Sequence, residues 1–368
     1  MSRIIRVEVW QIDLAPRAHA PDAARQPAGQ ETPMVRIVAD DGANGTGWSQ
    51  VSGPCGASVV GLLRAHLGPR LIGRDESHIE AIWKDLSGQV RVVAADALAA
   101  PALAAIDIAL WDLRCKRAKL PLHIAAGGAQ QRVRMHAAGS GLLQLDTSAL
   151  VERVAEAKAA GFRAARIQVG QASASEDIAR LEAVRARVGD AFELIADAGQ
   201  SFTLPEAVRR ARRFEAFDLA WLEQPLPADD LDAHARLVQS TSLPIAVGGA
   251  LGHASQFRDW LQRGACSIVQ PDAMRLGGIT PWLKVAHLAE AFNVPVCARA
   301  SMELHLALCA AVPNAAWVEY APQLQDVSTS RLRLESGHAF SAHKPGLGID
   351  WNEGELARRR AGAVATVA

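Results

Sequence analysis

The sequence has no excess of charge of either sign, because Lys plus Arg and Asp plus Glu each number 39 among its 368 residues. Balanced charge gives no electrostatic reason to bind nucleic acid or an anionic membrane surface. No apolar run approaches the roughly 20 residues that span a bilayer. We therefore expect neither nucleic acid nor a membrane among the partners of this chain.

The sequence also has no recognisable signal peptide and few cysteines. Residues 1–10 alternate like a strand and lack the apolar core of a signal peptide. The five cysteines are odd in number, have no CxxC spacing and lie mostly in apolar runs, where packing is their expected role: Cys55, Cys115, Cys266, Cys297 and Cys309. These features indicate a reduced, cytoplasmic protein.

A regular alternation of strand and helix patterns begins at Arg132 and continues to Glu319. It contains eight strands, and each strand but the last is followed by a helix. This rhythm predicts a parallel sheet closed into a barrel. Before it, three strands without intervening helices and three helices predict a separate domain. We expect an α+β domain over residues 1–125, a barrel over 126–325, and a segment over 326–368 that returns to the first domain.

Two segments have little core-forming character. Residues 15–32 are rich in Pro, Ala, Arg and Gln and contain His19. A loop of this length is either a disordered insert or a functional lid. The basic cluster Arg358–Arg360 is short, and we interpret it as a solvated tail.

Two acids mark the ends of consecutive predicted strands. Residues 191–197 and 218–223 are short apolar runs that end on Asp197 and Glu223. In a barrel, the C-terminal ends of the strands carry the active site, and two carboxylates there suit a hard divalent cation. Alternatively, both acids cap the following helices or pair with arginines between 209 and 213.

Several longer motifs are similar to a known family. They are Ala105-Ile-Asp-Ile-Ala-Leu-Trp-Asp112 with Lys116 and Gly127-Gly128, Asp197-Ala-Gly-Gln200, Trp221-Leu-Glu-Gln-Pro225, Gln270-Pro-Asp-Ala-Met-Arg-Leu-Gly-Gly278 and Trp317-Val-Glu319. On these residues the chain resembles the enolase superfamily, mandelate racemase-like branch, nearly from end to end. The resemblance implies an α+β capping domain over a modified (β/α)₇β TIM barrel. It also implies Mg²⁺ held by acids on the third to fifth strands, and removal of a proton α to a carboxylate by Lys or His bases.

The metal ligands implied by the resemblance are incomplete. Asp197 and Glu223 match two of them, but Gly249 stands at the third position, where the family has Glu. Glycine offers no side-chain oxygen, so we expect Mg²⁺ to bind weakly or not at all. Asp272, on the adjacent sixth strand, is a candidate replacement ligand.

The expected bases are replaced as well. Gln168 stands at the usual lysine position, and Arg299 stands where the family has a histidine. Neither accepts a proton at useful pH, since an arginine pKa exceeds about 12. Asp272 matches the acid that normally partners the histidine, and we expect Arg299 to form an ion pair with it. Glu319 matches the eighth-strand acid that donates to the substrate carboxylate.

Other side chains are candidates for the missing roles. His136 and His253 are acid–base candidates, or else hydrogen-bonded structural histidines. Arg166 and Arg299 are suited to binding a carboxylate bidentately. With His253 and His19, they are our candidates for binding a small anionic substrate.

Three functional hypotheses follow. The first is a metal-assisted lyase or isomerase, of racemase or dehydratase type, acting on a hydroxy acid or acid sugar with a replacement base such as Asp272 or a histidine. The second is a metal-free enzyme in which Arg166 and Arg299 bind a carboxylate. The third is a catalytically degenerate homologue. The resemblance also implies a homo-oligomer.

Overall fold

The structure is a computed structural model that describes residues 2–14, 30–51, 54–93, 96–139 and 143–368. Of the possible lid over residues 15–32, residues 15–29 with His19 lie outside the described residues, whereas residues 30–32 belong to a strand. The described chain forms two sheets, one of four strands and one built around a closed parallel barrel. No helix within these ranges is both long and apolar enough to cross a membrane.

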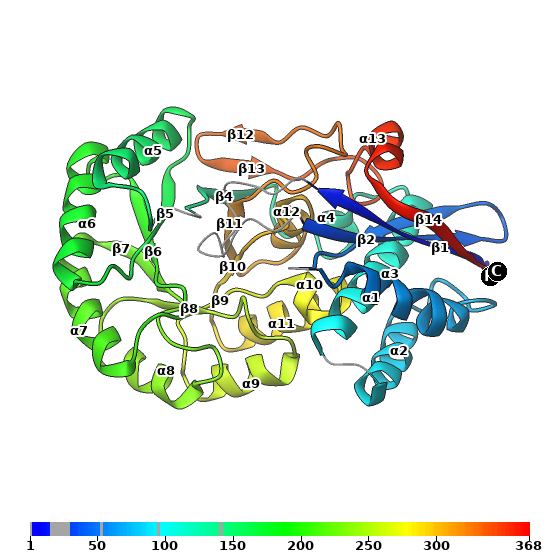
Figure 1. The fold of residues 1–368 in the computed structure, drawn as a ribbon, viewed down its shortest axis with the longest axis horizontal. Coiled ribbons are helices and arrows are strands. Elements are labelled where there is room, and N and C mark those ends of the chain that lie inside the picture. Colours follow the sequence, from blue (N-terminus) through cyan, green and yellow to red (C-terminus); the bar gives the residue numbers. More distant parts are fainter. Residues whose placement is uncertain (1, 15–29, 52–53, 94–95, 140–142) are drawn as a thin grey trace.

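The four-stranded antiparallel sheet belongs to the capping domain, on the right in Figure 1. Its order is β14 (Arg360–Val367), β1 (Ile4–Leu14), β2 (Gln30–Ala39) and β3 (Asn44–Trp48). The helices of this domain are α1 (Gly56–Leu62), followed by a π-helical turn at Leu63–Leu67 and a 3₁₀ turn at Gly68–Arg70, α2 (Ile79–Val93) and α3 (Asp96–Ala118).

Close packing of β3 on α3 holds the capping domain together. A Cβ atom on Gly47 would lie 2.2 Å from the Ala105 carbonyl oxygen and 2.5 Å from the Ala109 nitrogen. Only glycine lets a strand approach a helix backbone this closely. The apolar face of α3, including Ile106, Leu110 and Leu113, is buried.

The barrel consists of eight parallel strands, and pairing of β11 with β4 closes the ring. This confirms the predicted capping domain and barrel. The strands are β4 (Arg132–Ala137), β5 (Ala164–Gln168), β6 (Glu193–Asp197), β7 (Leu219–Glu223), β8 (Ile245–Val247), β9 (Ile268–Val269), β10 (Val296–Ala298) and β11 (Ala315–Tyr320). The helices between them are α5 (Thr147–Ala159), α6 (Ala174–Val188), α7 (Leu204–Phe214) with a 3₁₀ turn at Glu215–Phe217, α8 (Leu231–Val238), α9 (Ala254–Gln262), α10 (Ala273–Leu276), α11 (Ile279–Ala291) and α12 (Met302–Ala311), while α4 (Leu122–Ala125) precedes the barrel.

The segment after the barrel serves both sheets. The hairpin β12 (Arg333–Glu335) and β13 (His338–Phe340) extends the barrel sheet, because β13 pairs with β4. Strand β14 instead pairs with β1 of the capping domain, and Figure 1 shows the two side by side. Arg358–Arg360 do not form a tail as we interpreted them, since they join α13 (Glu353–Arg358) to β14, although Arg358 and Arg360 are solvent-exposed as expected. The division at residues 125/126 and 325/326 stays a prediction.

The two-residue period of the strands sorts the barrel interior into layers. One buried cluster fills the interior on the side away from the C-terminal ends of the strands: Ala164, Ile195, Trp221, Ala246, Ile268, Cys297 and Trp317. Successive side chains on a strand point to opposite faces, so the residue two positions later points inward again, nearer the C-terminal mouth. Apart from Gly248, those next residues are polar: Arg166, Asp197, Glu223, Gln270, Arg299 and Glu319. The sequence pattern therefore places one charged layer on top of one apolar layer.

Candidate active site

Arg166 lies at the centre of the charged layer. Its side chain has no exposed surface. One terminal nitrogen, Nη1, donates to Asp197 Oδ2 and lies 3.3 Å from Glu223 Oε1, and the other, Nη2, lies 2.6 Å from Glu319 Oε1. A single guanidinium thus joins acids from β6, β7 and β11. This is the planar, multidentate geometry to which arginine is suited.

Arg299 lies beside the same acids, on the side of the mouth. Its Nε is 3.0 Å from Glu223 Oε1, and its Nη2 is 3.7 Å from Asp197 Oδ2. The expected ion pair of Arg299 with Asp272 is wrong. The reason is that Arg299 follows β10 on the inward face, where two acids already converge, whereas the Asp272 side chain caps the next helix.

The remaining oxygens of the two central acids bond to the fold itself. Asp197 Oδ1 accepts from the Gly199 N–H at 2.9 Å. Glu223 Oε2 accepts from Trp221 Nε1 at 3.1 Å and from Gln270 Nε2 at 2.8 Å. The sequence motifs assign no role to Trp221 or Gln270, although their inward position on β7 and after β9 is a signal for one.

The backbone after Arg299 is strained. Ala300 and Ser301 both have positive φ, at 50° and 36°, a region that costs a non-glycine residue on the order of 1–3 kcal/mol. The Ala300 N–H donates to Glu319 Oε2 at 3.0 Å, and the Ser301 hydroxyl bonds Gln323 Oε1 at 3.0 Å. The turn that aims Arg299 into the mouth is therefore fixed to an acid of the same site.

Asp272 lies apart from the two arginines. It caps α10 by accepting from the Met274 N–H at 2.9 Å, and its side chain is 16% exposed. His305 Nε2 is 3.8 Å away, but it accepts the Ala273 N–H at 3.1 Å, and His305 Nδ1 lies 2.9 Å from the Ala300 carbonyl. Both ring nitrogens are thereby used by the backbone, so we interpret His305 as a structural histidine.

The other predicted residues occupy different surroundings. Gln168 Oε1 accepts from the Leu143 N–H at 3.1 Å. His136 is buried, with its ring edge-on to Trp221 and Trp317, and burial lowers its pKa. His253 caps α9 and lines a cavity between barrel and cap together with Trp83 and Leu103.

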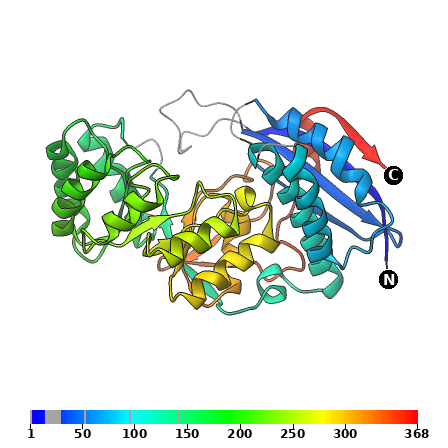
Figure 2. The same ribbon diagram turned by 90° about the horizontal axis from the view of Figure 1, so that it is seen from below.

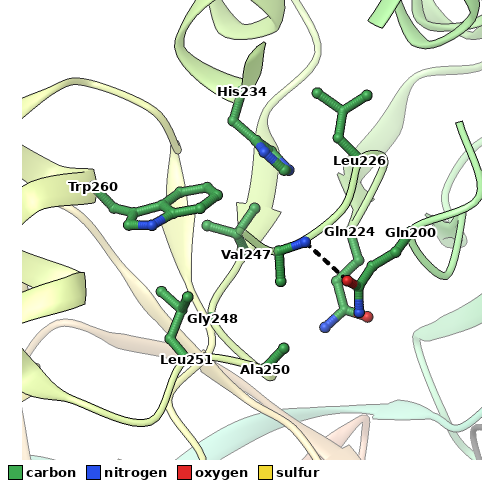
Figure 3. A pocket seen from close by; sticks show the side chains of 10 residues that line it. Gln200, Gln224, Leu226, His234, Val247, Gly248, Ala250, Leu251 and Trp260 are labelled. Atoms are coloured by element: carbon green, nitrogen blue, oxygen red, sulfur yellow. Dashed lines mark hydrogen bonds between the residues drawn. The ribbon is translucent and has the colours of Figure 1, made fainter. Parts of the chain in front are cut away.

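A second small pocket is lined by residues of β8 and of the segments that follow β6 and β7 (Figure 3). It contains no carboxylate or arginine, and the Ala228 N–H donates to Gln200 Oε1 at its edge at 2.9 Å. Its lining residues are Gln200, Gln224, Leu226, Ala228, His234, Val247, Gly248, Ala250, Leu251 and Trp260. Apart from Gly248, its lining residues are not members of the charged layer.

The neighbouring charges shift the acids in different directions. Burial opposes the ionisation of Glu319, but Arg166 and Arg299 outweigh it and lower its pKa to about 2. Glu223 is likewise held with a lowered pKa by Arg299 and Arg166 against burial. Burial, with Glu223 nearby, raises the pKa of Asp197. Despite its burial, Arg166 has a raised pKa because three carboxylates surround it.

The residues of this layer do not form a three-carboxylate site for Mg²⁺. Asp197 Oδ2 and Glu223 Oε1, the oxygens that converge, each face both arginines. Gly249 supplies no ligand, and within the described ranges no group of three His, Cys, Asp or Glu residues is arranged to hold a metal ion. The proposed set of Asp197, Glu223 and Asp272 is therefore not gathered around one point.

Comparison with known proteins places this architecture in a family. Residues 7–126 match the Mandelate racemase / muconate lactonizing enzyme, N-terminal domain, and residues 149–355 match the Enolase C-terminal domain-like family. The chain belongs to the enolase superfamily. As a mandelate racemase/muconate lactonizing enzyme-like member, it stands among lyases and isomerases.

Two relatives illustrate this membership. The L-talarate/galactarate dehydratase of Salmonella typhimurium is 32% identical over 357 residues, which is 95% of this chain and 89% of that protein. The 3,6-anhydro-alpha-L-galactonate cycloisomerase of Streptomyces coelicolor is 33% identical over 316 residues, 86% of this chain and 87% of that protein.

Solved structures agree with the fold and hold metal. An L-talarate dehydratase from Polaromonas sp. JS666, complexed with Mg and L-glucarate, superposes with a TM-score of 0.93 at 33% identity, covering 100% of this chain and 99% of that chain. A racemase from Streptomyces coelicolor with bound magnesium gives 0.92 at 31% identity, covering 97% of this chain and 100% of that one. Magnesium binding is thus a property of solved structures in this superfamily.

Proposed function

We propose that this enolase-superfamily protein is a lyase or isomerase, of dehydratase or racemase type, that removes the proton α to the carboxylate of an acid sugar or hydroxy acid. The observation that carries the proposal is Arg299, a guanidinium at the mouth whose side chain is 10% exposed and which lies against Glu223 and Asp197. A substrate carboxylate placed on Arg299 would lie at the C-terminal ends of the strands, where this fold performs its chemistry.

We infer that Asp272 accepts the proton. Arg166 and Arg299 are too basic for this role, the Gln168 amide does not titrate, and His136 is buried. Asp272 is partly exposed, and within the described chain it has no arginine partner. In this step the α C–H bond breaks, its electron pair moves onto the substrate carboxylate, and the proton moves to Asp272. Arg299 would stabilise the resulting enediolate charge.

Three further features of the proposal concern the metal ion, the oligomeric state and the cellular location. Mg²⁺ is expected to bind weakly or not at all, because Gly249 replaces a ligand. A homo-oligomeric state remains a prediction. So does a cytoplasmic location, which agrees with five cysteines that are all unpaired.

A second candidate function is carboxylate binding without turnover. It is favoured by the extent to which Arg166 and Arg299 are already engaged by the chain's own acids. Guanidinium groups that are already paired in this way have less positive charge left to stabilise an enediolate, which lowers the expected turnover.

The first experiment exposes the protein to galactarate, glucarate, talarate, gluconate and arabinonate in deuterated water and follows the α-proton by NMR. Loss of that signal, or formation of a 2-keto product, is the expected result. Binding of a compound without any exchange would instead support the second candidate. If none of these compounds binds, both candidates lose their support for this substrate class.

The variant Asp272→Asn tests the base. Asparagine caps a helix as well as aspartate does, so the α10 cap is retained. We expect turnover to fall on the order of 100-fold or more while the acid sugar still binds. Asp259→Asn is the control, since Asp259 is an exposed acid paired only with its neighbour Arg258. Equal turnover in wild type and Asp272→Asn would remove Asp272 from the mechanism.

A further inference from the structure

The charged layer has an unusual arrangement of positive groups around two converging oxygens. Asp197 Oδ2 bonds Arg166 Nη1 and lies 3.7 Å from Arg299 Nη2. Glu223 Oε1 lies 3.3 Å from the same Arg166 nitrogen and 3.0 Å from Arg299 Nε. Two guanidinium groups therefore share two carboxylate oxygens.

The opposite oxygens of these acids cannot easily turn inward. Asp197 Oδ1 is held by the Gly199 N–H, and Glu223 Oε2 is held by the indole of Trp221 and the amide of Gln270. Any divalent ion between the acids would have to coordinate the oxygens that the arginines already engage. Displacing both guanidinium groups would leave two buried cations without their partners, which is costly.

Gly249 accounts for the space that Arg299 occupies. A Cβ atom built on Gly249 would lie 3.4 Å from Arg299 Nη1 and 3.7 Å from Arg299 Cδ. It would also lie 2.9 Å from Gln224 Nε2. A side chain longer than one carbon, extended from Gly249 in this direction, would run into the guanidinium. The absence of a ligand side chain at Gly249 and the presence of Arg299 in the space beside it therefore depend on each other.

We infer that the guanidinium groups of Arg166 and Arg299 take the place of a divalent metal ion in this chain, and that Gly249 is the residue that makes room for Arg299. The positive charge at the mouth is then part of the covalent structure and does not depend on dissolved metal. This inference goes beyond the proposed function. Because it concerns metal binding alone, it is tested without any substrate.

The test uses Mn²⁺ as a spectroscopic probe for a divalent ion, with free Mn²⁺ measured by electron paramagnetic resonance. We expect the wild-type protein to bind no stoichiometric Mn²⁺ at millimolar concentration. We also expect its thermal unfolding temperature to be the same with Mg²⁺ and with EDTA. A single Mn²⁺ site of submillimolar affinity in the wild type, lost in Asp197→Asn, would overturn the inference.

A gain-of-function variant tests the exchange itself. In R166K/G249E/R299S, the substitution at 249 adds a third carboxylate and the one at 299 removes the obstructing guanidinium, while R166K is shared with the control. Mn²⁺ affinity should rise roughly tenfold or more over wild type, because affinity increases with the charge of the ligands. The matched control is R166K/G249E/R275S, which removes an exposed arginine on α10 and retains Arg299. We expect no gain there. Equal binding by both variants, or by neither, would refute the role given to Arg299 and Gly249.

Discussion

Replacing Arg166 with methionine should destabilise the whole barrel. Methionine has a similar length but no hydrogen-bond donor, and the site it enters has no exposed surface. Three carboxylates, those of Asp197, Glu223 and Glu319, would lose a partner at once. Removing one partner of a buried ion pair costs about 3–5 kcal/mol, because the remaining charge stays buried. We expect a loss of at least this size.

The assay is urea unfolding followed by tryptophan fluorescence. Trp221 donates to Glu223, so it reports directly on this layer. The control is Arg153→Met, which removes a surface arginine 50% exposed and 3.9 Å from Glu156, and should cost about 0–1 kcal/mol. Equal effects of the two substitutions would refute the view that Arg166 holds the charged layer together.

A second substitution provides an internal check on the cause. Glu319→Gln removes one of the three acids that Arg166 contacts. If uncompensated negative charge is the reason for the loss, R166M/E319Q should be more stable than R166M alone, by on the order of 1 kcal/mol. A double variant that is less stable would assign the loss to packing instead.

Two further predictions concern the contacts that hold the cap. Burial raises the pKa of Asp107 to about 7 although Thr280 donates to it. The folded state then favours the protonated acid, so its contribution to stability is complete below about pH 4 and is lost as the pH rises to 7. At 1.36 kcal/mol per pH unit this amounts to about 4 kcal/mol. Asp107→Asn should abolish that slope in urea unfolding at pH 5 and pH 8, and an unchanged slope would contradict the assignment. Gly47→Ala should cost about 1–3 kcal/mol or more, because the new Cβ meets the backbone of α3. Gly61→Ala, which meets nothing within 4 Å, should be neutral or slightly stabilising, and equal unfolding midpoints for both variants would contradict the packing argument.

The sequence pattern was sufficient for the architecture and for the charged members of the layer, but not for Gln270. Apolar runs that end on Asp197 and Glu223 fix both the strand and the direction of its last side chain, since inward positions recur every second residue. The alternation of strands and helices predicted a closed ring, and pairing of β11 with β4 confirms it.

The partners within that layer were harder to predict. The sequence places Arg299 and Asp272 near the ends of neighbouring strands, and an ion pair between them was a reasonable expectation. Which acid Arg299 contacts depends on the backbone turn that follows it, and the left-handed Ala300 and Ser301 set this turn. Strain of this kind cannot be recognised from the sequence, because neither residue is glycine.

The last strand, β14, was not predicted for a related reason. Strand β14 is mostly small residues with little alternation, and its burial is partial. Such a strand is specified by the open edge of β1 that it covers rather than by its own pattern. An edge partner far away in the chain cannot be recognised from local periodicity.

The pairing of β14 with β1 also has a consequence for synthesis on the ribosome. Residues 4–14 are made before the barrel, yet their neighbour in the sheet, residues 360–367, emerges only after the entire barrel. Until then β1 presents an unpaired rim, a template for pairing with other nascent chains. A polypeptide halted anywhere in the barrel should therefore be far more prone to aggregate than the finished one.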